Sequence, residues 1–179
     1  MIYLSAGHHN KDSGAVSGVF VERDLTKESR FLIEKHIDPK QVIKDKDFET
    51  NSQFQIRIKP GSGSVVFDIH FNAGSPTATG TECFVNKADF ANKNSLSYKM
   101  ADEICKKTSE ILGIKNRGVK SEASSQHPRI GILNLKAGIS ILWEICFISS
   151  PLDMPKYILH KEKLNKEIAI ILKKYDALK

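Results

Sequence analysis

The chain has 179 residues, of which 40% are hydrophobic and 27% are charged, the composition of a soluble globular protein. A chain of this length forms one ordinary domain with a sizeable hydrophobic core. No hydrophobic run is long enough to cross a membrane. The N-terminal residues lack the basic region and the long apolar core of a secretory signal, so we expect no signal peptide.

The formal net charge is +6, which suits an anionic partner such as a nucleic acid, an acidic lipid or an anionic cell-wall polymer. The sequence contains no nucleic-acid-binding motif, and we expect no nucleic-acid partner. The three cysteines are odd in number, widely spaced and set among apolar residues. They are therefore predicted to be buried free thiols and not a disulfide framework.

Short apolar runs alternate with amphipathic segments along the chain. Apolar and β-branched runs predict strands at 2–5, 41–44, 81–85, 130–135 and 139–144, with a further strand in the stretch 65–74. Helical spacing of apolar residues predicts helices at 23–36, 95–112 and about 155–175. Residues 45–60 are polar and weakly patterned, and residues 116–129 are polar and irregular.

Strands that alternate with helices favour an α/β fold. We predict a single domain with an open, mixed, mostly parallel sheet of about six strands and helices on both faces. In such sheets ligands bind beyond the carboxyl ends of the strands.

The stretch 65–74 places polar residues at every second position of an otherwise apolar strand. Asp68, His70 and Asn72 therefore share one face of that strand. Buried polar groups need partners, because their desolvation is costly. A lone histidine in such a strand is usually a hydrogen-bonded core residue, unless other segments supply groups to meet it.

Three other segments do supply such groups. His8 follows the first strand, Glu22 lies at the start of the first helix, and Glu144 ends the last strand. We expect these residues to meet His70 in one crevice at the carboxyl ends of the strands. A carboxylate at a helix N-terminus is also favoured electrostatically without any ligand, which is the alternative for Glu22.

Two histidines and one glutamate form a zinc-ligand set that leaves one coordination position open for water. A second carboxylate is then needed to accept the proton of that water and deliver it to a leaving amine. Glu144 is the candidate, since its apolar neighbours would raise its pKa toward the useful range. The alternative for Glu144 is a buried ion pair.

Six stretches of the chain form an ordered set of motifs: 7–15 (Gly-His-His-Asn-Lys-Asp-Ser-Gly-Ala), 22–25 (Glu-Arg-Asp-Leu), 69–73 (Ile-His-Phe-Asn-Ala), 80–85 (Gly-Thr-Glu-Cys-Phe-Val), 117–120 (Arg-Gly-Val-Lys) and 144–149 (Glu-Ile-Cys-Phe-Ile-Ser). Together they resemble the motifs of the zinc-dependent N-acetylmuramoyl-L-alanine amidases of the Amidase_3 type. The resemblance implies that His8, Glu22 and His70 bind one zinc ion and that Glu144 is the catalytic carboxylate. It also implies a mixed sheet flanked by helices.

Three positions depart from the family pattern. His9 stands where the family usually has glycine, and it could replace His8 on the metal. Asp68 replaces a serine, and either orients a ligand imidazole or makes a structural ion pair. Cys146 replaces a glycine; its apolar surroundings favour an inert packed thiol over a zinc ligand. The family's threonine-arginine strand is not recognisable at 42–47.

Further candidates for substrate or supporting roles are Asn72, His127, Arg129 and Arg117. His127 could face the cleft and stabilise a developing oxyanion, or it could be a surface-loop residue. Either arginine could hold a substrate carboxylate bidentately or could brace the loop between them.

The resemblance implies a peptidoglycan hydrolase that cleaves the amide between the lactyl group of N-acetylmuramic acid and L-alanine of the stem peptide. The alternatives are a zinc peptidase that cuts within the stem, and an inactive peptidoglycan-binding or regulatory module. We expect residues 1–179 to be one catalytic domain without a separate wall-binding domain, and to be monomeric. The protein would act on the cell wall after release or export, as a host autolysin would, or stay cytoplasmic until lysis if it is phage-encoded, as an endolysin would. A cytoplasmic recycling enzyme is a further alternative.

Overall fold

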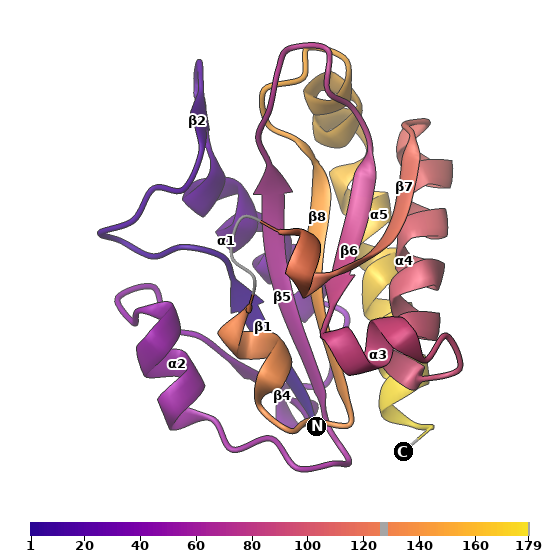
Figure 1. Cartoon of the computed structure of the whole chain (residues 1–179). Helices are drawn as coiled ribbons and strands as arrows, with labels where there is room; N and C mark the ends of the chain where they lie inside the picture. The colour runs from indigo at the N-terminus through magenta and orange to yellow at the C-terminus, as the bar shows by residue number, and fades with distance from the viewer. Residues whose placement is uncertain (126–128, 179) are drawn as a thin grey trace.

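A computed structural model describes residues 1–125 and 129–178 of the chain. Its main sheet has six strands in the order β4-β1-β5-β8-β6-β7 (Figure 1). The strands are β4 (Val42–Lys44), β1 (Ile2–Ala6), β5 (Val65–Asn72), β8 (Ile139–Phe147), β6 (Thr81–Val85) and β7 (Asn116–Ser121). The first four run parallel to one another, whereas β6 is antiparallel to β8 and β7 is parallel to β6. The sheet is thus open, mixed and mostly parallel, as predicted.

The two faces of the sheet are covered unequally. The long helices α1 (Glu22–Glu34), α4 (Leu96–Leu112) and α5 (Asp153–Asp176) cover one face. The other face carries short elements, among them the helix α2 (Asn51–Arg57) and the 3-10 turn η3 (Gly131–Asn134), both in front of the sheet in Figure 1. The remaining elements are a small hairpin of β2 (Val16–Ser17) and β3 (Phe20–Val21), the 3-10 turns η1 (Pro39–Gln41) and η2 (Glu122–Ser124), and α3 (Lys87–Ala91). No described helix combines the length and apolar character needed to cross a membrane.

Alternation along the central strands produces two hydrophobic layers. Odd-numbered residues of β5, such as Phe67 and Ile69, pack with the three long helices in the larger layer. Val66 points to the other face and joins a small cluster with Phe54 of α2 and Ile132 of η3. Asp68, His70 and Asn72 follow Val66 on this thinly covered face. Short elements therefore leave room for a cavity there.

Four segments differ from the sequence prediction. The apolar run at 130–135 is not a strand: η3 buries Ile132 and Leu133 against the sheet, and Glu122 accepts hydrogen bonds from the backbone of Ile130 and the side chain of Asn134. The irregular stretch 116–129 contains the edge strand β7, and the weakly patterned 45–60 contains α2. Strand β8 also continues beyond Glu144 to Phe147.

Candidate active site

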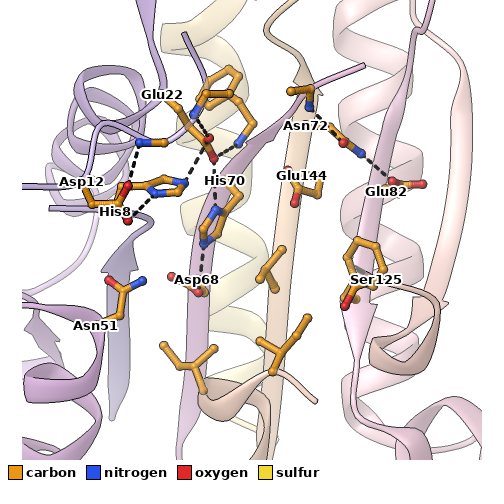
Figure 2. Close-up of a pocket in the computed structure, with 18 of the residues that line it drawn as sticks. His8, Asp12, Glu22, Asn51, Asp68, His70, Asn72, Glu82, Ser125 and Glu144 are labelled. Carbon is orange, nitrogen blue, oxygen red and sulfur yellow. Dashed lines mark hydrogen bonds and ion pairs between the residues drawn. The ribbon is translucent and has the colours of Figure 1, made fainter. Parts of the chain in front are cut away.

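A cavity of about 610 Å³ lies on the thinly covered face of the sheet. Its walls come from the loop after β1, the start of α1, strands β5, β6 and β8, helix α2 and the segment around η2 and η3. Figure 2 shows His8, Glu22, His70 and Glu144 around this space. Because β8 continues past Glu144, the cavity lies over the sheet near the carboxyl ends of the strands, and not beyond them as expected.

His8, Glu22 and His70 form a compact cluster at one side of the cavity. Nε2 of His8 lies 3.1 Å from Oε2 of Glu22, and Nδ1 of His70 lies 3.1 Å from Oε1 of the same carboxylate. One potential ligand atom from each residue lies within 4.8 Å of the others. This group of two imidazoles and one carboxylate could hold a metal ion, and it is the set that the sequence predicted.

Backbone donors fix the Glu22 carboxylate between the two histidines. Oε1 accepts from the backbone N–H of Phe71 at 3.0 Å, and Oε2 accepts from that of Ala15 at 2.9 Å. Burial alone would raise the pKa of Glu22, but the hydrogen bonds from His70 and His8 outweigh it and hold this pKa well below its usual value. Glu22 is thus ionised and 4% exposed, as a buried ligand carboxylate must be.

Each histidine turns its other ring nitrogen toward an aspartate. Nδ1 of His8 lies 2.9 Å from Asp12, and Nε2 of His70 lies 3.2 Å from Asp68. Burial would lower the pKa of both imidazoles. The Glu22 contact outweighs burial at His8, and the Asp68 charge outweighs it at His70, so both pKa values are raised. A carboxylate behind a ligand imidazole fixes its tautomer and raises its basicity toward a metal.

The backbone around His8 is shaped by the cluster. His8 itself has a φ of 72°, a left-handed conformation that is uncommon for residues other than glycine and often marks a functional site. Gly7 lies under the His70 ring, where a Cβ atom would come within 2.4 Å of it. Gly14 also has a positive φ, and its Cβ would lie 2.5 Å from the His8 ring. Both glycines allow the backbone to pass close to the imidazoles.

Glu144 lies beside the cluster on β8, where it is the register partner of His70. Its Oε2 is buried and has no hydrogen-bond partner among the described residues. Burial, reinforced by the negative charges of Glu22 and Glu82, outweighs the opposing effect of His70 and raises the pKa of Glu144 to about 7. The structure thus gives Glu144 no ion-pair partner within the described chain, and its carboxyl group can exchange a proton near neutral pH.

A second group of hydrogen-bonded polar side chains lies next to Glu144, toward β6. Glu82 of β6 is the antiparallel register partner of Glu144. It accepts a 2.6 Å hydrogen bond from Nδ2 of Asn72 and a 2.8 Å hydrogen bond from Nε of Arg117. Arg117 also stacks over the ring of Phe147, 5.0 Å from its centroid. Arg117 therefore braces β6 and β7 through Glu82.

Other sequence candidates lie outside this arrangement. His127 falls outside the described residues. Arg129 is exposed and belongs to no described ion pair. His9 is not part of the cluster; its Nδ1 accepts from the backbone of Lys11 instead. Cys146 is fully buried, and burial raises its thiol pKa, consistent with an inert packed residue.

Sequence reasoning missed two residues that touch the site. Asp12 belongs to the 7–15 motif, but the sequence does not reveal its contact with His8. Glu82 belongs to the 80–85 motif, and only the register between β6 and β8 shows that it faces Glu144.

The sequence model of Amidase_3, described as N-acetylmuramoyl-L-alanine amidase, matches residues 2–174. The chain belongs to this family.

Individual proteins are similar to this chain in sequence or in fold. A crystal structure of a Neisseria meningitidis protein, provisionally assigned as an N-acetylmuramoyl-L-alanine amidase, is 26% identical with a TM-score of 0.78, over 97% of this chain and 93% of that one. The amidase AmiC2 of Nostoc punctiforme is 20% identical with a TM-score of 0.75, over 97% and 95% of the two chains, and shares the fold. An uncharacterised Bacillus subtilis protein, YqiI, is 26% identical over 87% of this chain and 73% of its own length.

Proposed function

We propose that this chain hydrolyses the amide between the lactyl group of N-acetylmuramic acid and L-alanine in peptidoglycan, with zinc as its cofactor. His8, Glu22 and His70 would hold the ion, and Glu144 would carry the proton. The observation that supports this proposal best is that Oε2 of Glu144, which has no hydrogen-bond partner among the described residues, shares a cavity with a complete His-Glu-His ligand set.

The residues present fit a zinc ion on chemical grounds. Two imidazole nitrogens and one carboxylate are the donors of catalytic zinc sites, which keep one position for water. Asp12 and Asp68 supply the supporting carboxylates that such histidines usually have. Gly7 and Gly14 leave space beside both rings that any larger residue would fill. We also propose that residues 1–179 form one catalytic domain.

A zinc ion at this site would lower the pKa of a bound water and polarise the scissile carbonyl. Glu144 takes a proton from the attacking water and later gives it to the nitrogen of the leaving L-alanine, which a pKa near neutrality favours. Asn72 uses one N–H bond of Nδ2 for Glu82, so its second N–H bond can donate to the substrate. Glu82 and Arg117 keep that amide in place.

The test is digestion of purified cell wall by wild type, Glu144→Gln and a matched exposed control, Glu110→Gln, with zinc content measured for all three. We expect wild type and the control to release stem peptides that begin with L-alanine. Loss of a general acid–base lowers the rate by about 10²- to 10⁴-fold, so Glu144→Gln should bind zinc and release almost none.

Each other outcome points elsewhere. New amino termini within the stem would indicate a zinc peptidase. Zinc binding without any cleavage by wild type would indicate a peptidoglycan-binding or regulatory module. Absence of zinc from wild type would overturn the ligand assignment.

A further inference from the structure

The cavity extends beyond the residues used above, and its second part has a different chemistry. Parallel rows of register partners cross the sheet here. His70, Glu144 and Glu82 form the first row. Asp68, Leu142 and Phe84 form the next row, one step toward the amino end of β5, and all three line the cavity. Residues two apart on a strand are separated by about 7 Å. The spacing between the two rows is therefore comparable to the size of a small functional group.

The second row combines an apolar floor with one unsatisfied acceptor. Leu142 and Phe84 are buried and belong to the same hydrophobic cluster as Ile132 of η3. Asp68 is 4% exposed. Its Oδ2 faces His70, whereas its Oδ1 is buried and has no hydrogen-bond partner among the described residues. A buried carboxylate oxygen without a donor is costly, and a ligand N–H group in the cavity would supply one.

Carboxamides form the wall above this floor. Asn51 and Gln55, on the same side of α2, both line the cavity, and Figure 2 labels Asn51 among the lining residues. Gln55 also lies close to η3, because a Cβ atom on Gly131 would lie 2.5 Å from its Oε1. Helix α2 and η3 therefore approach each other beside this part of the cavity.

The chemistry of this part of the cavity matches an acetamido group. It combines apolar side chains, the carboxylate acceptor of Asp68, and carboxamide donors. The acetamido methyl group would lie on Leu142, Phe84 and Ile132, the N–H would donate to Asp68, and the carbonyl would accept from Asn51 or Gln55. We propose that this pocket binds the acetamido group of the sugar whose lactyl amide is cleaved. The inference rests on the proposed function, in which the scissile carbonyl lies at the first row. In N-acetylmuramic acid the acetamido group stands on the ring carbon next to the one that bears the lactyl ether, a separation of about one row.

The test uses the full chain with isotope-labelled isoleucine and leucine methyl groups, titrated with N-acetylmuramic acid and with muramic acid, its free amine. We expect the methyl resonances of Ile132 and Leu142 to shift with the first sugar and much less with the second. Methyl groups of the larger core layer, such as those of Leu164 and Ile168, serve as internal controls. Equal shifts with both sugars, or no shifts at Ile132 and Leu142, would overturn the proposal.

A variant pair tests the carboxamide wall. Asn51→Ala should weaken N-acetylmuramic acid binding several-fold, by about the strength of one hydrogen bond. Ser52→Ala, an exposed substitution in the same turn of α2, should leave it unchanged. Equal effects of the two substitutions would contradict the proposed contact. The titration does not depend on catalysis, so the two proposals can fail separately. Methyl shifts without any cleavage of cell wall would contradict only the proposed function. Cleavage of cell wall without these shifts would contradict only the proposed acetamido pocket.

Discussion

Asp12 and Asp68 give each histidine of the cluster an environment that the motif residues alone do not create. Each imidazole has one nitrogen toward Glu22 and the other toward an aspartate, so neither ring can rotate without losing a contact. Asp68 is a buried carboxylate of β5, only 4% exposed. The carboxylate orients His70 and, through its other oxygen, borders the proposed acetamido pocket.

The Asp12 contact can be tested without removing a ligand. Asp12→Asn keeps an oxygen for the backbone N–H of Gly14 but removes the negative charge beside His8. We expect zinc affinity to fall by about 10- to 100-fold, the usual cost of losing such a supporting carboxylate. Competition with a chromophoric chelator measures it. Asp24→Asn, at an exposed residue paired with Arg23, is the control, and an equal loss in both variants would contradict the role of Asp12.

The two glycines with positive φ near the hairpin form a second matched pair. Gly14→Ala and Gly18→Ala impose a similar backbone strain of about 1 kcal/mol, because both residues are left-handed. Only at Gly14 would the new Cβ strike the His8 ring; at Gly18 there is no atom within 4 Å. We expect Gly14→Ala to lose zinc affinity and Gly18→Ala to retain it. If both variants bind zinc like wild type, the close approach of Gly14 does not shape the site.

At the scale of elements, the sequence predicted the segments that have a long and regular apolar pattern. The buried strands β1 and β5 and the long helices α1 and α4 carry clear apolar periodicity and were predicted within a few residues. Strand β7 was missed because it is an edge strand without a fully buried residue. Helix α2 buries only Phe54 and so has no apolar stripe. Its capping box, Thr50 with Gln53, was the available sequence signal.

The junction between β8 and α5 depends on one buried carboxylate. Asp153, the first residue of α5, accepts from the hydroxyl of Thr79 and from the backbone N–H groups of Gly80 and Phe147. It thereby ties the loop before β6 to the end of the strand that carries Glu144. Removal of this acceptor would leave buried donors unpaired.

We therefore expect Asp153→Ala to lower the free energy of unfolding by about 2–4 kcal/mol. Urea denaturation, followed by circular dichroism, measures the change. Asp102→Ala removes an exposed carboxylate that pairs with Lys106, and it should change stability by less than about 0.5 kcal/mol. A similar small change for Asp153→Ala would show that the junction does not depend on this residue.

At the scale of the whole molecule, the location of the site follows from the unequal covering of the sheet. Three long helices seal one face, whereas α2 and η3 leave a cavity over the other. The sequence indicated which residues meet, because their motifs follow strand ends. It could not show the part of the cavity that α2 and η3 border, because the pattern did not predict the structure of these two segments.

Protons and metal compete for the same atoms, so the stability of the whole molecule should depend on both. Without metal, the pKa values of His8 and His70 are raised above their usual value, because Glu22 and Asp68 favour the charged imidazoles. This contribution to stability is fully present below the unfolded-state pKa of about 6.5 and is lost as pH rises through the raised values. Zinc requires neutral imidazoles, so its binding releases these protons and tightens over the same range.

We expect the increase in Tm caused by a fixed zinc concentration to grow with pH from about 6.5 upward, and not to level off there as it would with unperturbed histidines. Thermal unfolding with zinc and with chelator across this range measures the increment, and His70→Ala should abolish it at every pH. An increment in wild type that is constant or falls with pH would mean that zinc does not bind through these two imidazoles.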